Sequence, residues 1–183
     1  GTFDPPHLGH EKIIDFCLDN CDRLVIVPNR KSPDKAHIDN TSAHHRLNML
    51  KLINKKVIID EYEIKSKKIS YTYSTIQYLK ENYNNKLTMV IGYDQLINLE
   101  NWYNFKKIIQ EVDILCFYRK IPSVIEKRMI HKYKNIKIID KFEVDLSSSF
   151  LRKELMKFKN NNYKKFLNPK VLDYIKKYKL YEF

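Results

Sequence analysis

The stretch Gly1-Thr2-Phe3-Asp4-Pro5-Pro6-His7-Leu8-Gly9-His10 opens the chain, and apolar residues at helical spacing follow it as far as residue 20. Two prolines and a glycine predict a rigid turn ahead of a helix, with His7 and His10 on one face. A helix N-terminus attracts anions through its N–H groups and its dipole. Two imidazole donors beside Gly9, where a ligand can come close, therefore predict a phosphate site that stabilises developing negative charge. A capped surface turn with two solvated histidines is the alternative.

The chain has 183 residues, of which 43% are hydrophobic, and this size predicts a single domain over residues 1–183. No run of about 18 apolar residues is present, so we expect no membrane partner. Three cysteines cannot form a disulfide framework, and their odd number favours a reducing compartment, the cytoplasm. Because the first residue is Gly1 and not methionine, a processed segment ahead of it stays open.

The charge balance is basic, with 34 Lys and Arg against 22 Asp and Glu and a net charge of +12. Clustered lysines would indicate nucleic-acid binding. Here the lysines are scattered along the whole length, without a basic block. A positive field equally favours small anionic substrates such as nucleotides, so we expect no nucleic-acid partner.

Glycine is scarce, with only 3 residues in 183: Gly1, Gly9 and Gly92. Average usage is about 7%. A composition that suppresses glycine should keep it in turns with positive φ and where backbone must approach a ligand. These three positions are therefore the first candidates for a site.

The hydrophobic pattern alternates between short apolar runs and helical periodicity. Predicted strands cover 24–28, 57–59, 87–92, 114–118 and 136–139, and predicted helices 8–20, 70–83, 105–110, 123–131, 147–158 and 169–178, with one more capped by Ser42. This alternation predicts an α/β fold with a doubly wound parallel sheet covered on both faces. Such sheets bind ligands at the carboxyl ends of their strands.

Two further groups of residues fit this expectation. Three serines, Ser147-Ser148-Ser149, begin a predicted helix, and Arg152 follows one turn later, which predicts a second anion site suited to a polyphosphate. An ordinary serine N-cap is the alternative. Gly92 and Asp94 follow the clearest strand, where an acidic side chain can bind ribose hydroxyls. The sole tryptophan, Trp102, offers a stacking face, with core packing as its alternative.

These motifs resemble the HxGH nucleotidyltransferase superfamily, and the opening stretch resembles its nicotinate-nucleotide adenylyltransferase family. Residues 146–152 resemble the family's ISSTxIR signature, 92–94 with 102–103 its GxD…WY stretch, 70–75 its SYTxxT segment, and 28–35 with 46–49 its proline-rich loop and RxxM. The resemblance implies a Rossmann-like fold whose first strand lies ahead of Gly1.

The family activity implied is transfer of AMP from ATP to nicotinate mononucleotide, giving deamido-NAD and pyrophosphate. By this resemblance His7, His10 and Arg152 are catalytic, with the histidines on the α-phosphate and leaving oxygen and Arg152 on the β- and γ-phosphates. Mg²⁺ would bridge the phosphates, with no metal site made by the protein. The implied nucleotide-binding residues are Gly1, Thr2, Phe3, Gly9, Lys35, Arg46, Gly92, Asp94, Ser147 and Ser148. Those implied for the mononucleotide are Thr72, Trp102 and Tyr103.

Several alternatives stay open at this point. A sister enzyme could use nicotinamide mononucleotide, phosphopantetheine or a polyol phosphate in place of nicotinate mononucleotide. From a different class, the chain could be a basic nucleic-acid-binding module that keeps only a nucleotide fold. A homo-oligomer is also compatible with the sequence.

Overall fold

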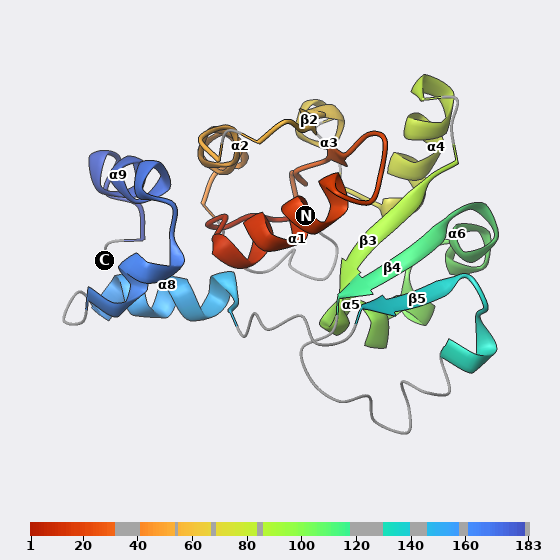
Figure 1. Cartoon of the computed structure of the whole chain (residues 1–183). Helices are drawn as coiled ribbons and strands as arrows, with labels where there is room; N and C mark the ends of the chain where they lie inside the picture. The colour runs from red at the N-terminus through yellow and green to blue at the C-terminus, as the bar shows by residue number, and fades with distance from the viewer. Residues whose placement is uncertain are drawn as a thin grey trace. The chain divides into compact units, whose positions relative to one another are not determined.

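A computed structural model describes residues 1–31, 41–53, 55–66, 69–83, 86–117, 130–139, 146–157 and 161–181. Contacts within the chain group it into two compact units (Figure 1). The first unit joins Gly1–Ser70 with Asp145–Phe183, and the second is Tyr71–Val144. The expected single domain over the whole chain stays a prediction, and we describe each unit by itself.

The first unit is mainly helical around a small parallel sheet. Its elements are α1 (Leu8–Leu18), β1 (Val25–Ile26), α2 (Ala43–Lys51), β2 (Ile58–Ile59), α3 (Tyr62–Lys65), α8 (Ser148–Lys157), the 3₁₀ helix η3 (Asn161–Phe166) and α9 (Pro169–Lys177). Strands β1 and β2 pair in parallel, with Val25 opposite Ile58. The Gly1 nitrogen donates to Val27 O at 2.8 Å, and Asn29 N–H donates to Gly1 O at 2.8 Å, which places Gly1 beside the end of β1.

The second unit is a three-stranded parallel sheet with its helices. It contains α4 (Thr72–Asn82), β3 (Thr88–Gly92), α5 (Tyr93–Ile97), η2 (Leu99–Asn101), α6 (Phe105–Glu111), β4 (Asp113–Phe117) and β5 (Ile136–Ile139). The strand order is β3-β4-β5, all parallel (Figure 1). Ile91, Ile108, Ile114 and Cys116 are at the centre of its core. Parallel pairing with intervening helices in both units confirms the predicted α/β class.

Local predictions hold best where an end signal accompanies the periodicity. Ser42 caps α2 as expected, since its hydroxyl accepts the His45 N–H at 3.3 Å. The predicted inner face of that helix is buried at Leu47 and Leu50, and Ile53, two positions after the helix ends at Lys51, is buried as well. The strand predicted at 24–28 is shorter, Val25–Ile26, and the helix predicted at 8–20 ends at Leu18. The helix predicted at 123–131 lies outside the described residues apart from its last two positions.

Of the two reasons for which glycine was expected to be kept, the positive-φ turn is wrong, while close approach to a ligand stays a prediction. No glycine has positive φ, and this conformation is adopted instead by Phe3, Asn104, Lys179 and Tyr181. Gly92 has an ordinary φ of −85°, and a Cβ added there would meet nothing within 4 Å. The surrounding protein therefore does not require glycine at position 92. None of the described helices is long and apolar enough to cross a bilayer.

Candidate functional site

The histidine turn forms as the sequence predicts. His7 is the N-cap of α1 with extended backbone (φ −146°), and its side chain is buried while that of His10 is partly exposed. The two ring centroids lie 3.7 Å apart. The His7 N–H donates to His10 Nδ1 at 3.2 Å. Because a neutral imidazole that accepts at Nδ1 carries its hydrogen on Nε2, His10 can donate a hydrogen bond from Nε2.

The residues around this turn fix its shape. Pro5 and Pro6 are among the fully buried side chains, and Gly9 is buried as well. The Phe3 ring lies 4.9 Å from the His10 ring. Phe3 has a left-handed backbone, φ 52°, which costs a non-glycine residue roughly 1–2 kcal/mol. The first turn of α1 leaves N–H groups that no helical carbonyl can accept, so the turn offers donors to an anion.

The second predicted anion site lies against the same turn. Ser147 caps α8, its hydroxyl accepting the Phe150 N–H at 3.1 Å. The Ser148 hydroxyl donates to Pro5 O at 2.9 Å, and Arg152 Nη1 donates to Asp4 O at 2.6 Å. The structure thus joins two stretches that are more than 140 positions apart in the sequence. Their side by side placement within the first unit was not derivable from either motif alone.

Arg46 has a different environment from the one predicted. Only 1% of it is exposed, and its guanidinium donates to Thr2 O at 2.7 Å, Arg30 O at 2.9 Å and Thr41 O at 3.0 Å. A fourth bond runs to Asn29 Oδ1 at 3.2 Å. Burial lowers the pKa of this guanidinium, and the charge of Asp4 opposes the shift. These contacts favour a role in holding three backbone segments together over the predicted contact with a phosphate.

Two residues of this network, Asp4 and Tyr181, were not predicted from the sequence. Asp4 is fully buried, and Tyr181 donates its hydroxyl to Asp4 Oδ1 at 2.7 Å. Asp4 Oδ2 lies 3.7 Å from Arg152 Nη1. The position of Asp4 inside the opening motif could have drawn attention to it. Nothing in the sequence connects it to Tyr181, which is 177 positions away.

The remaining nucleotide-binding predictions in the first unit concern residues 1–35. Gly1 is exposed beside the end of β1, and the Thr2 hydroxyl accepts from Asn29 Nδ2 at 3.3 Å. Lys35 lies outside the described residues. The roles of Gly1, Thr2, Phe3 and Lys35 in binding nucleotide stay predictions.

In the second unit, Gly92 and Asp94 lie where β3 gives way to α5. Both residues are exposed, and Asp94 is in the first turn of α5. Burial raises the pKa of the neighbouring Cys116 thiol to about 12, and the Asp94 carboxylate adds to the shift. The carboxyl end of a parallel strand therefore carries an exposed acid next to a position without a side chain, as predicted.

The two segments predicted to bind the mononucleotide adjoin each other within the second unit. Thr72 begins α4, and the preceding Tyr71 ring lies 5.1 Å from the ring of Tyr103, which is 58% exposed. Tyr73 lies 6.4 Å from the same ring. Trp102 is partly exposed and packs against the core of this unit. Trp102 therefore contributes to packing, as the alternative interpretation expected, and its stacking on a pyridine ring stays a prediction.

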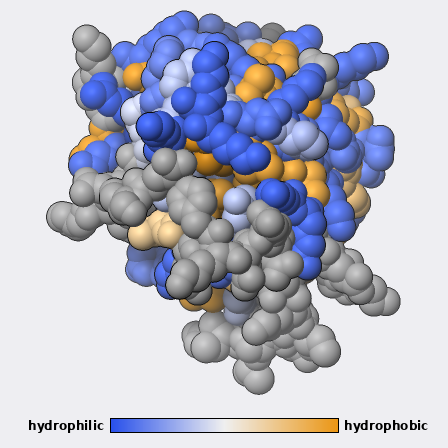
Figure 2. Space-filling model, turned by 90° about the vertical axis from the view of Figure 1, so that its left-hand side faces the viewer, coloured by the Kyte–Doolittle hydropathy of each residue, from blue (hydrophilic) through white to orange (hydrophobic). Residues whose placement is uncertain are grey.

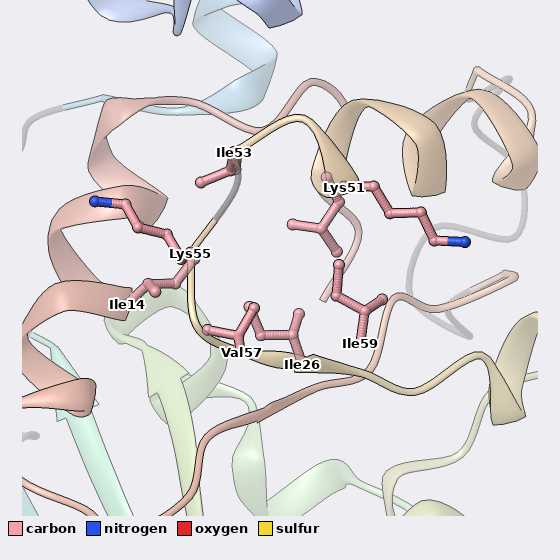
Figure 3. A pocket seen from close by; sticks show the side chains of 8 residues that line it. Ile14, Ile26, Lys51, Ile53, Lys55, Val57 and Ile59 are labelled. Atoms are coloured by element: carbon pink, nitrogen blue, oxygen red, sulfur yellow. The ribbon is translucent and has the colours of Figure 1, made fainter.

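A separate cavity of about 110 Å³ lies in the first unit between α1, α2 and the β1–β2 sheet (Figure 3). Isoleucines line it, with Lys51 and Lys55 at its edge. Both lysines are in ion pairs, with Glu61 and Asp15 respectively, each at 2.8 Å. No predicted site residue lines this cavity.

Within the part of the chain that the structure describes, no three His, Cys, Asp or Glu side chains are grouped so that they could hold a metal ion. Asp4, the carboxylate that precedes the histidine turn, is fully buried and bonded to Tyr181. It therefore has no surface with which to reach a solvated cation.

Comparison with known proteins shows which family the chain belongs to. Residues 1–154 match the family described as cytidylyltransferase-like. A protein of Leptospira interrogans, named probable nicotinate-nucleotide adenylyltransferase, is 33% identical over 99% of this chain and 94% of its own length. One of Fusobacterium nucleatum with the same name is 35% identical over 85% of this chain and 84% of its own.

A solved structure shares the fold over nearly the whole chain. It is the Plasmodium falciparum nicotinic acid mononucleotide adenylyltransferase complexed with NaAD, with a TM-score of 0.84 and 27% identity over 99% of this chain and 94% of that one. The same protein complexed with APC gives a TM-score of 0.79.

Proposed function

Because the chain belongs to the cytidylyltransferase-like family and, within it, to the nicotinate-nucleotide adenylyltransferases, we propose that it transfers AMP from ATP to nicotinate mononucleotide. The products are deamido-NAD and pyrophosphate. The observation that carries the proposal is the joining of α1 and α8 at one turn, where His10 Nε2, the backbone N–H of Ser148 at the start of α8 and the Arg152 guanidinium are donors for a polyphosphate.

The reaction needs positioning and charge neutralisation more than proton transfer. A phosphate oxygen of the mononucleotide attacks the α-phosphorus of ATP, the bond from that phosphorus to the bridging oxygen breaks, and pyrophosphate leaves with the electron pair. The attacking phosphate is already ionised at neutral pH, so no general base is required. The protein gains rate by placing donors where negative charge develops.

We assign the contact with the α-phosphate and leaving oxygen first to His10, whose ring is the more exposed of the two histidines. The buried His7 ring, whose centroid lies 3.7 Å from that of His10, acts together with His10. The His7 backbone N–H, which donates to His10 Nδ1, holds the orientation of the His10 ring. Gly9 and the first N–H groups of α1 complete this end of the site.

We assign the β- and γ-phosphates to Ser147, Ser148 and Arg152. The Arg152 side chain is 23% exposed, and its bonds to Asp4 O and Ser149 Oγ leave further N–H groups for a ligand. A guanidinium forks onto phosphate oxygens in a fixed plane, so Arg152 also sets the direction of the leaving pyrophosphate.

We assign recognition of the mononucleotide to the second unit. Trp102 and Tyr103 provide aromatic faces, and Thr72 provides a hydroxyl at the start of α4. The exposed Gly92 and Asp94 keep their predicted role in nucleotide binding, through close backbone approach and a ribose contact.

Mg²⁺ enters, in this proposal, as part of the substrate MgATP. It neutralises phosphate charge, as is usual where protein ligands are few.

We also propose that the protein works in the cytoplasm without binding nucleic acid. The thiols of Cys17, Cys21 and Cys116 are unpaired, which suits a reducing compartment. Among the residues that Figure 2 colours, hydrophilic side chains predominate, with hydrophobic groups between them. Salt-sensitive binding to oligonucleotides would contradict this proposal. A homo-oligomer is likewise a proposal, and sedimentation tests it.

The test of the main proposal is an assay of the natural full-length protein with MgATP and a set of acceptors. We expect pyrophosphate and deamido-NAD with nicotinate mononucleotide. Faster turnover with nicotinamide mononucleotide would show that this compound is the acceptor. Turnover with phosphopantetheine or a polyol phosphate would assign the acceptor to that compound instead. Absence of pyrophosphate release with every acceptor would refute an adenylyltransferase.

A further inference from the structure

Tyr181, which follows α9, bonds directly to the opening motif. Its hydroxyl donates to Asp4 Oδ1 at 2.7 Å, and the two side chains are 8% and 0% exposed. We propose that Tyr181 is a positioning residue of the reaction: it satisfies the carboxylate of Asp4, and thereby leaves Arg152 directed towards the phosphates of ATP. This proposal rests on the function proposed above.

The Asp4 carboxylate needs partners because it is fully buried. A carboxylate away from water is stable only when hydrogen bonds or opposite charges replace its solvation. Oδ1 accepts the Tyr181 hydroxyl, whereas Oδ2 accepts no hydrogen bond from the described residues. The Arg152 guanidinium, with Nη1 3.7 Å from Oδ2, is the cation in ion-pair range of that oxygen within the described part of the chain.

Arg152 therefore has two possible uses. Nη1 already donates to the Asp4 carbonyl at 2.6 Å, and the rest of the side chain remains 23% exposed. If the Tyr181 hydroxyl were lost, the buried carboxylate would keep no hydrogen-bond donor that the structure describes. Its attraction for the guanidinium would then rise, because opposite charges attract strongly where water is excluded. A guanidinium drawn inwards is less available to a phosphate.

The segment that delivers Tyr181 is held in an unusual conformation. After α9 the chain turns back through Lys179 and Tyr181, whose φ values are 48° and 64°. A non-glycine residue adopts this region only when its surroundings compensate the strain. Burial and the nearby Asp4 raise the pKa of Tyr181, so its hydroxyl keeps the proton that it donates. Together these features indicate a built contact and not a chance approach of the chain end.

The experiment is a double-mutant cycle on Tyr181 and Arg152. Tyr181→Phe removes one hydroxyl, Arg152→Ala removes the guanidinium, and both changes are combined. Tyr174→Phe is the matched control, since Tyr174 is on α9 and its hydroxyl bonds to His45 and Asn48 on α2, with no link to Asp4. Each variant is measured at a temperature where circular dichroism shows all of them folded. The readouts are kcat, the KM for each substrate, and the affinity for a non-hydrolysable ATP analogue.

We expect Tyr181→Phe to weaken the ATP analogue and to lower kcat/KM for ATP by about tenfold, the lower end of what the loss of an outer partner costs at metal sites. The KM for the mononucleotide should change less than about twofold, and Tyr174→Phe should leave both substrates unaffected. In the Arg152→Ala background the same change should cost less than about twofold, because both substitutions act through one group.

Three results would overturn the proposal: equal losses from Tyr181→Phe in both backgrounds, an equal loss from Tyr174→Phe, or normal ATP binding in Tyr181→Phe. A protein that binds the ATP analogue but makes no deamido-NAD would refute the proposed function instead. The binding measurements would then still decide the role of Tyr181.

Discussion

The substitution His10→Asn separates the two tasks that the structure gives to one imidazole. Nδ1 accepts the His7 N–H at 3.2 Å and so supports the start of α1, while Nε2 faces away from that bond as a donor. The Oδ1 atom of asparagine can accept the same N–H, but asparagine has no group at the Nε2 position. His10→Ala removes both functions. Comparing the two variants therefore distinguishes a structural effect from a catalytic one.

The expected magnitudes differ between the two variants. Losing a donor aimed at developing charge costs about 10²–10³ in kcat, or about 2.7–4 kcal/mol, so both variants should lose that much. Losing the bond at the start of α1 costs typically about 1 kcal/mol of folding stability. For a chain of this size that lowers Tm by roughly 2–4 °C, in His10→Ala alone.

The assay is steady-state pyrophosphate release, combined with thermal unfolding of each variant. His44→Asn is the matched control, because His44 is an exposed histidine near the start of α2. We expect it to have normal turnover and an unchanged Tm. If His10→Asn kept kcat within about threefold of the unmodified protein, the donor argument would be refuted, since one such donor should be worth at least about 10².

Three further outcomes follow from the same structure. Trp102→Ala should raise the KM for the mononucleotide roughly 5- to 150-fold, the equivalent of about 1–3 kcal/mol of stacking, with little change in the KM for ATP. Binding of nicotinate mononucleotide should also alter the fluorescence emission of this sole tryptophan. If the KM and the emission are both unchanged, Trp102 has a packing role only. Gly92→Ala should leave Tm unchanged, because a Cβ there meets nothing within 4 Å, yet should raise the KM for the nucleotide whose backbone contact Gly92 makes. An unchanged KM for both substrates would contradict close approach. EDTA should abolish turnover without lowering Tm, and a lower Tm would reveal a resident metal that the described residues do not suggest.

The sequence predicted elements whose ends carry their own chemical signal. The hydroxyl of Ser42, the β-branched run ahead of Gly92 and the prolines before His7 act over a few residues, so a local pattern suffices to find them. The short strands were less predictable, because pairing with a neighbour decides where β1 and β2 end.

The contacts within the site depend on long-range packing and could not be predicted in the same way. Arginine is a residue type that often binds phosphate, but the guanidinium of Arg46 is buried and donates to three backbone carbonyls. The bond between Tyr181 and Asp4 forms only when the two segments of the first unit, 177 positions apart at these residues, pack together. The expectation that glycine would occupy positive-φ positions was wrong because non-glycine residues adopt that conformation here. Phe3 and Asn104 have positive φ, and packing around them compensates the strain.

The most direct measurement of the central claim is a crystal structure of the full-length protein with a non-hydrolysable ATP analogue and Mg²⁺. The account predicts an α-phosphate oxygen within about 3.2 Å of His10 Nε2 and the β- and γ-phosphates on Arg152 and the Ser147–Ser148 end of α8. A triphosphate bound away from the turn that joins α1 and α8, with His10 and Arg152 both out of hydrogen-bond range, would contradict it.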